Sequence, residues 1–155
     1  MDVAAKDVMS RRFHTLSPEM DLSDAVGMFK TASREEGRKI FGMMVTDAEG
    51  RLAGMLSMYD ILLFIQPKHI HLWGAMDDVD IAGLVASSCR QARSILVGDI
   101  MTPEVVSATP DTHLLVVLDI MIKKHIRRIP VLENDRIEGI LYISDLFYHL
   151  VEELA

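Results

Sequence analysis

The chain has 155 residues, of which 50% are hydrophobic, and is therefore long enough to bury one core of ordinary domain size. Its 16 basic and 23 acidic residues give a net charge of −7, which argues against a protein that binds the phosphate backbone of nucleic acids. No apolar run approaches the roughly 20 residues that a membrane-spanning helix needs, so we expect no membrane insertion.

The first residues and the cysteine content bear on location. The chain does not open on the basic and apolar regions of a signal peptide. The single cysteine, Cys89, cannot form an internal disulfide, and we interpret it as a buried, inert thiol rather than a reactive one. A reducing, cytoplasmic location is expected.

The first 66 residues predict alternating strands and helices. They open on the sequence Asp-Val-Met-Ser at residues 7–10. Extended apolar segments predict strands, and apolar residues at helical spacing predict helices. In chain order, we expect a strand at 13–16, a helix at 22–29, strands at 43–46 and 52–56, and a helix at 60–65.

Residues 67–94 are predicted to bridge the two parts of the chain. A loop is expected at 67–74, and residues at helical spacing then predict a helix: Ile81, Leu84, Val85, Ser88 and Ala92. His69 and His71 lie near three aspartates, which are residue types that bind metals: Asp77, Asp78 and Asp80. These residues do not follow a regular spacing, and the chain has no second cysteine that could supply a thiolate ligand. We therefore predict no metal site.

Residues 95–155 repeat the same order of elements. We expect a strand at 105–108, a turn at 109–111, and a helix over an apolar stripe formed by Leu114, Val117, Leu118 and Met121. Two apolar runs, 129–132 and 137–142, flank a cluster of turn-forming residues, which indicates a β-hairpin. A last helix is expected at 145–154. Pro130 has no amide hydrogen and is expected at an edge or a strand end.

The two parts are copies of one another. Asp7 and Asp99 are 92 positions apart, whereas Gly54 and Gly139 are 85 apart, so the first copy carries about seven extra residues. We place them in two polar segments, 31–37 and 47–50. The sequence thus predicts a mixed α/β (α+β) fold made of two β-α-β-β-α repeats, at 1–66 and 95–155.

Three sequence features, in this order and duplicated, point to a known family. They are the two Asp-apolar-Met-Ser/Thr openings, the segment His-Ile-Arg-Arg-Ile-Pro-Val at 125–131, and the two Gly-apolar-apolar-x-x-x-Asp endings. The chain resembles a tandem cystathionine β-synthase (CBS) domain pair, or Bateman module, over nearly its whole length except the bridge. The resemblance implies one compact module with pseudo-two-fold symmetry, two clefts between the repeats, and a homodimer shaped as a flat disc.

The resemblance also implies a function. Such modules usually bind an adenosine-containing small molecule and transmit its presence to another protein. We therefore expect AMP, ADP, ATP or S-adenosylmethionine as a regulatory ligand and an unidentified regulated protein as partner. Because the sequence shows no catalytic constellation, we expect no enzymatic activity. The alternative is a ligand-free dimerisation or interaction module.

Ser57 and Asp60 are the first candidate ligand-binding residues, because they match the Thr/Ser-x-x-Asp motif that meets ribose and phosphate in the family. A carboxylate accepts hydrogen bonds from ribose hydroxyls, and a hydroxyl at a helix start lies beside amides that attract phosphate. The same spacing also resembles a helix capping box. The two interpretations are compatible. In the second copy only Asp145 matches, because Tyr142 replaces the hydroxyl residue, and its ring is expected to fill the cleft or to stack on a base.

The remaining candidates concern adenine and phosphate. Adenine suits a slot between apolar side chains, and the candidates for this slot, which also suit the core, are Phe13, Thr15, Met43, Ser107 and Ile129. Arg127 and Arg128 belong to the densest basic cluster, with Lys123, Lys124 and His125, and would supply counter-charge. In an extended segment they point to opposite faces, so we expect at most one of them in a given cleft. The corresponding cations of the first copy are Arg34, Arg38 and Lys39.

Overall fold

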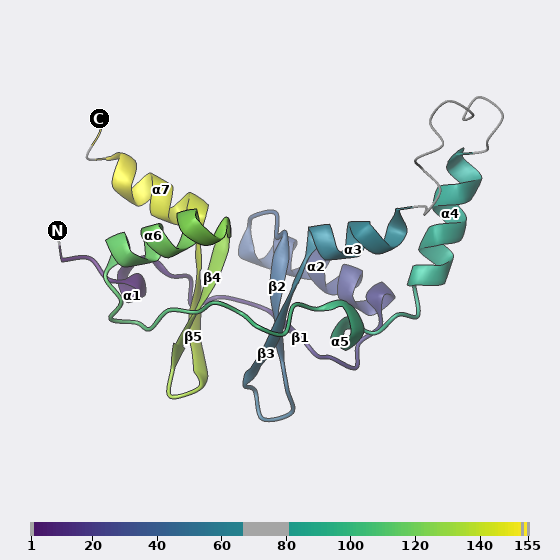
Figure 1. Ribbon diagram of the computed structural model, residues 1–155, viewed down its shortest axis with the longest axis horizontal. Coiled ribbons are helices and arrows are strands. Elements are labelled where there is room, and N and C mark those ends of the chain that lie inside the picture. Colours follow the sequence, from purple (N-terminus) through teal and green to yellow (C-terminus); the bar gives the residue numbers. More distant parts are fainter. Residues whose placement is uncertain (1, 67–80, 153, 155) are drawn as a thin grey trace.

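The computed structural model describes residues 2–66, 81–152 and 154. Two halves lie side by side, with most helices toward one end of the molecule and the tips of two β-hairpins at the other (Figure 1). The first half holds β1 to β3, and the second holds β4 and β5. Each half has its own cluster of buried apolar residues.

The first half is built on a three-stranded sheet in the order β1-β2-β3. The short strand β1 (Thr15–Leu16) runs parallel to β2 (Gly42–Thr46), and β3 (Leu52–Ser57) pairs with β2 in the antiparallel direction. Its helices are α2 (Leu22–Glu36) and α3 (Met58–Ile65), and α3 contacts α4 (Ile81–Ala92). The strand and helix order predicted for the first copy is confirmed.

Helix α2 is longer than the sequence predicts. It begins after Asp21, whose side chain accepts a hydrogen bond from the amide of Asp24 at 2.8 Å, and it ends at Gly37, which has a left-handed φ of 69°. The polar segment at 31–36 therefore continues the helix instead of forming a loop. The extra residues of the first copy lengthen α2, which has 15 residues, relative to the matching helix of the second half, which has 11.

The second half contains α6 (Leu114–Lys124), the hairpin of β4 (Arg128–Glu133) and β5 (Arg136–Tyr142), and α7 (Ile143–Val151). The strand expected at 105–108 is wrong, because only Ala108 forms an isolated parallel bridge, to Val131. Ala108 donates to the oxygen of Pro130 at 2.9 Å. The next bond of a parallel ladder would come from the amide of residue 130, and Pro130 has no such hydrogen.

The opening segment of each copy packs on the half that the other copy builds. Helix α1 (Ala5–Val8) and the following Ser10 pack on the second half, where Ser10 and Ile140 of β5 exchange backbone hydrogen bonds of 2.8 and 3.0 Å. Helix α5 (Val97–Ile100) and Thr102 pack on the first half, where Thr102 pairs with Met55 of β3. Figure 1 shows α1 beside α6 and α7, and α5 beside the first sheet. Each half is therefore completed by the other copy's opening.

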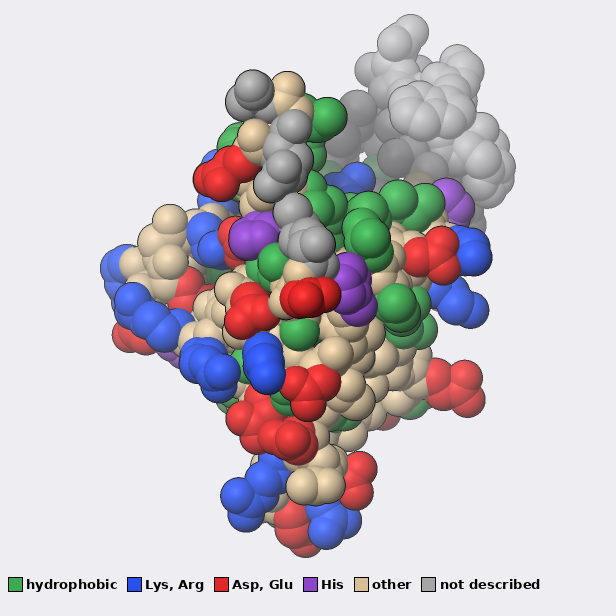
Figure 2. Space-filling view, turned by 90° about the vertical axis from the view of Figure 1, so that its left-hand side faces the viewer, with side chains coloured by type: hydrophobic (Ala, Val, Ile, Leu, Met, Phe, Trp, Pro, Cys, Tyr) green, Lys and Arg blue, Asp and Glu red, His purple; other side chains and the backbone are tan. Residues whose placement is uncertain are grey.

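The helical end of the molecule carries exposed apolar side chains. They include Leu115 and Ile122 of α6 and Phe147 of α7, as well as Leu62 and Phe64 of α3. Figure 2 shows hydrophobic side chains toward the upper part of the face it displays, with acidic and basic ones intermixed below. Within the described residues, no helix has the length and apolar character needed to span a bilayer.

Candidate functional site

A cleft of about 590 Å³ lies between the halves. The first half contributes the end of β3 and the start of α3. The second half contributes the segment after α5 and the turn between α6 and β4. The lining residues are Phe41, Met55, Ser57, Met58, Tyr59, Asp60, Thr102, Glu104, Val105, Val106, His125, Ile126, Arg127 and Arg128.

Ser57 and Asp60 lie in this cleft and also cap α3. The amide of Asp60 donates to Ser57 Oγ at 3.2 Å, and the amide of Ser57 donates to Asp60 Oδ2 at 2.9 Å. This is the reciprocal pair of a capping box, so the capping interpretation is confirmed. The cap engages one carboxylate oxygen of Asp60, and it holds the side chain in one orientation at the cleft.

Arg127 and Arg128 both line the cleft, contrary to our expectation that only one of them would. The chain bends at Arg127, and β4 begins only at Arg128, so the alternation of an extended strand does not apply to this pair. His125 precedes them with a left-handed φ of 54° and ends α6. The bend gathers three nitrogen-bearing side chains at one wall of the cleft.

Arg128 also lies across the boundary between the halves. A Cβ built on Gly42 of β2 would stand 2.5 Å from Nη1 and 2.9 Å from Cδ of Arg128, so the arginine occupies the space that a larger residue at position 42 would fill. Burial lowers the pKa of Arg128 from its ordinary value. A guanidinium keeps its proton in proteins, so Arg128 brings a desolvated positive charge to the cleft.

The other walls of the cleft are largely apolar. Val105, Val106 and Ile126 come from the second half, and Phe41 and Met55 from the first. None of these five residues is predicted from the sequence. The only local signal for them is that each lies within a few positions of a predicted residue, such as Met43, Ser57, Ser107 or Arg127.

Six of the ten candidate residues lie outside this cleft. Met43 and Ile129, 3% and 0% exposed, belong to the two cores, because their side chains point to the buried faces of their strands.

The other four candidates lie at or near the ends of the repeats' elements. Phe13 precedes β1 and is half-buried, and Thr15 pairs with Met44 within the sheet. Ser107 is exposed, and its neighbours Val105 and Val106 line the cleft instead. Asp145 lies at the start of α7.

A comparison with protein families matches the CBS domain twice, at residues 5–67 and 97–152. The chain belongs to the CBS domain family. The two matches cover both repeats, so the tandem CBS pair and its mixed α/β fold are confirmed. The matched segments begin at α1 and α5, which are the two exchanged openings.

Several relatives and solved structures are similar to nearly the whole chain. An uncharacterized protein of Methanocaldococcus jannaschii is 26% identical over 94% of this chain and 90% of its own length. The crystal structure of CBSX2 in complex with AMP has a TM-score of 0.70 at 21% identity and covers 98% of each chain. The cytosolic domain of the Mg²⁺ channel MgtE in complex with ATP has a TM-score of 0.70 at 20% identity, over 96% of this chain and 49% of that one.

In the second CBS repeat, Asp145 stands at the position that corresponds to Asp60, and an arginine engages its carboxylate. Arg38 makes a two-pronged ion pair with Asp145, with Nη1–Oδ2 and Nη2–Oδ1 distances of 3.0 Å each. The guanidinium carbon of Arg38 also lies 4.6 Å from the ring centroid of Tyr142. The ion pair raises the pKa of Arg38, and burial, followed by the nearby Glu36 carboxylate, raises the pKa of Tyr142 to about 12.

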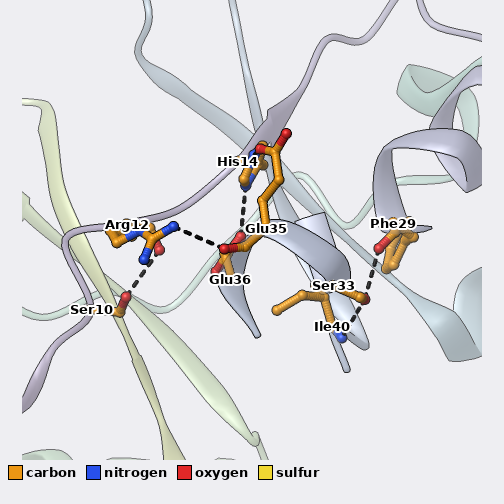
Figure 3. A network of polar contacts seen from close by, with 8 residues as sticks. All are labelled: Ser10, Arg12, His14, Phe29, Ser33, Glu35, Glu36 and Ile40. Atoms are coloured by element: carbon orange, nitrogen blue, oxygen red, sulfur yellow. Dashed lines mark hydrogen bonds and ion pairs between the residues drawn. The ribbon is translucent and has the colours of Figure 1, made fainter. Parts of the chain in front are cut away.

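A polar cluster joins the first CBS repeat's opening to the end of α2 (Figure 3). His14 Nδ1 lies 2.8 Å from Glu36 Oε2, and His14 Nε2 lies 2.6 Å from Glu35 Oε2. Hydrogen bonds to Glu36 and then to Glu35 raise the pKa of His14. Arg12 adds a hydrogen bond from Nη2 to the backbone oxygen of Glu35 at 2.8 Å. Together they fix the segment that leads into β1.

No group of three metal-binding side chains occurs among the residues that the structure describes. His69, His71 and the aspartates near them lie outside those residues.

Proposed function

We propose that the chain is a regulatory CBS module that binds an adenosine-containing nucleotide in the cleft between its repeats. The observation that carries the proposal is the composition of the cleft. Ser57 and Asp60, the candidate pair for ribose, face it from one repeat, and the cations Arg127 and Arg128 face it from the other.

The chemistry of the cleft suits the parts of a nucleotide. Asp60 accepts hydrogen bonds from ribose hydroxyls, and the phosphate meets the start of α3 on one side and Arg127 on the other. The apolar side chains of Val105, Val106 and Ile126 offer flat contact to a purine ring. The volume of about 590 Å³ lies within the range of roughly 300–1,000 Å³ that is usual for small-molecule sites.

The similar structures support this choice of ligand. CBSX2 is described in complex with AMP, and the cytosolic domain of MgtE in complex with ATP. In our proposal AMP, ADP, ATP or S-adenosylmethionine acts as a regulatory ligand. The chain regulates a partner protein, as a homodimer and in the cytoplasm, and does not itself catalyse a reaction. A ligand shifts such an equilibrium only through its different affinities for the two states of the module.

A thermal-shift screen with AMP, ADP, ATP and S-adenosylmethionine tests the proposal. A ligand present at 100 times its dissociation constant stabilises the folded state by about 2.7 kcal/mol, which raises the melting temperature by several degrees. We expect such a rise with at least one of these compounds. The absence of a shift with all of them would overturn the proposal.

Asp60→Ala then locates the site. The substitution removes one cap, at a cost of about 1 kcal/mol in stability, and abolishes nucleotide binding. Asp21→Ala is the matched control, because Asp21 caps α2 in a similar way and is not among the residues that line the cleft. It should cost a similar amount and leave the affinity unchanged. An Asp60→Ala protein that binds normally would place the site elsewhere.

A second candidate is a ligand-free dimerisation or interaction module. It is favoured by a depression of about 500 Å³ between α2 and α3, lined mainly by apolar side chains that include Val26, Phe29, Ile61 and Leu62. A stable dimer in sedimentation experiments, combined with no thermal shift from any adenosine compound, would favour this alternative.

A further inference from the structure

The second CBS repeat carries a carboxylate that matches Asp60, at the place where the resemblance predicts a second, pseudo-symmetric cleft, but its surroundings differ. Asp145 corresponds to Asp60, and Tyr142 corresponds to Ser57, each 85 positions farther along the chain. A tyrosine cannot form the cap that Ser57 forms, and α7 begins without a side-chain cap.

The second repeat's tyrosine and aspartate both contact Arg38, from the other repeat. The left-handed Gly37 ends α2 and turns the chain, and the amide of Arg38 then donates to the oxygen of Ser33 at 3.2 Å. The amide of Ile40 donates to Ser33 Oγ at 2.9 Å. The backbone on both sides of Arg38 is thus fixed to α2, and the side chain reaches across to the second half.

We propose that Arg38 and Tyr142 close the second cleft from within, so that each chain takes a single nucleotide, in the cleft of Ser57 and Asp60. This inference rests on the proposed function. Arg38 engages both carboxylate oxygens of Asp145, whereas the cap of α3 engages one oxygen of Asp60. Both carboxylate oxygens that a ribose would approach are therefore already engaged by a charged donor at Asp145, whereas one oxygen of Asp60 has no such partner among the described residues.

The ring of Tyr142 adds to this closure. It is half-buried, and the guanidinium carbon of Arg38 lies 4.6 Å from its centroid. A base entering from this side would have to separate the ring from the guanidinium and break the ion pair in the same movement. The stack and the ion pair share Arg38, so they are lost together.

Charge also distinguishes the two clefts. The Glu36 side chain is only 6% exposed, and burial, followed by the Glu36 carboxylate, raises the pKa of Tyr142, so a second negative charge acts on this ring together with that of Asp145. His14 and Arg38 offset these charges but are committed to them by hydrogen bonds. In the other cleft, Arg127 and Arg128 make no ion pair with a carboxylate of the described residues. This cleft also holds the carboxylates of Asp60 and Glu104, but its two arginines remain available to an anionic phosphate.

Calorimetric titration with AMP, ADP and ATP measures the number of nucleotides bound per chain. We expect one nucleotide for the natural protein and none for Asp60→Ala. Asp145→Asn should leave the number at one. Two nucleotides per natural chain, or a single one lost in Asp145→Asn and kept in Asp60→Ala, would overturn the inference.

The double variant Arg38→Ser with Tyr142→Ser tests the closure directly, because it recreates the Ser-x-x-Asp spacing and removes the guanidinium. We expect two nucleotides per chain, and a return to one when Asp145→Ala is added. Arg38→Met with Tyr142→Ser preserves more of the packing and serves if the first variant melts at a much lower temperature. A folded double variant that still binds one nucleotide would overturn the inference.

The same titrations separate this inference from the proposed function. If the natural protein binds no nucleotide but the double variant binds one, the proposed site fails and the closure by Arg38 and Tyr142 stands. If neither protein binds, both ideas fail.

Discussion

His14 lies between two carboxylates, and this position makes its charge matter for stability. Its ring nitrogens lie 2.8 Å from Glu36 and 2.6 Å from Glu35, and hydrogen bonds to Glu36 and then to Glu35 raise its pKa above the ordinary value of 6.5. A group whose pKa is higher in the folded state contributes stability that is complete below the unfolded pKa and is lost as the pH rises through the folded pKa. His14 should therefore stabilise the protein under mildly acidic conditions.

The expected result is a pH-dependent difference between the natural protein and His14→Gln. Urea unfolding from about pH 6 to about pH 9 should show the largest loss of stability in the variant at the acidic end and a shrinking loss toward the alkaline end. A difference that stays constant over this range would mean that the charge of His14 does not contribute.

The candidate site was predictable from the sequence where its residues act locally. Ser57 and Asp60 are three positions apart, and the spacing that suggests a cap also places both at the start of a helix. Arg38 and Asp145 are 107 positions apart, and no local pattern indicates that their side chains meet. The sequence predicts opposite faces for Arg127 and Arg128, because the bend at Arg127 leaves no signal in the residue types.

At the scale of elements, glycines show which helices and strands have room for a larger side chain. Gly27 lies within α2, and a Cβ there would meet no atom within 4 Å. Gly139 lies within β5, and a Cβ there would stand 2.6 Å from the backbone oxygen of Ser10 and 2.8 Å from Met9 Sδ. The first position is open, and the second is filled by the opening of the first repeat.

Alanine substitutions should therefore have opposite effects. Gly27→Ala should stabilise the protein by about 0.5–1 kcal/mol, because alanine favours the helix. Gly139→Ala should destabilise it by about 1–3 kcal/mol, because the carbonyl of Ser10 has to move. Urea unfolding measures both values. A Gly139→Ala protein as stable as the natural one would show that α1 and Ser10 do not pack closely on β5.

Elements were predictable wherever the apolar period was regular. The hairpins, α3 and α4 follow from such periods, and all of them are present. The expected strand at 105–108 is reduced to a bridge at Ala108 because its pairing depends on the missing amide of Pro130, a residue 22 positions away. The polar residues of 31–36 gave no helical stripe, and their helix depends on continuation from the preceding turns and on the cap at Gly37.

For the molecule as a whole, the exchanged openings make each half depend on the other. Met9 is 9% exposed and packs in the core of the second half, whereas the corresponding Met101 packs against the core of the first half. The sequence revealed the duplication but not this exchange, because both arrangements have the same order of elements along the chain.

The exchange predicts crosswise effects of two matched substitutions. Met9→Ala, which should cost about 2 kcal/mol or more, should speed amide hydrogen exchange most in β4 and β5. Met101→Ala should do so most in β2 and β3. Faster exchange mainly in β2 and β3 after Met9→Ala would contradict the exchanged arrangement.

The contact of Arg128 with Gly42 has a consequence for assembly between different molecules. These two residues stand at corresponding places in the repeats, 86 positions apart, one with no side chain and the other with the longest cationic one. Two first repeats meeting in the same way would leave a gap, and two second repeats would bring a pair of guanidinium groups into collision. The contact is therefore heterotypic, and it disfavours swapped assemblies in which identical repeats from two chains replace the natural pairing.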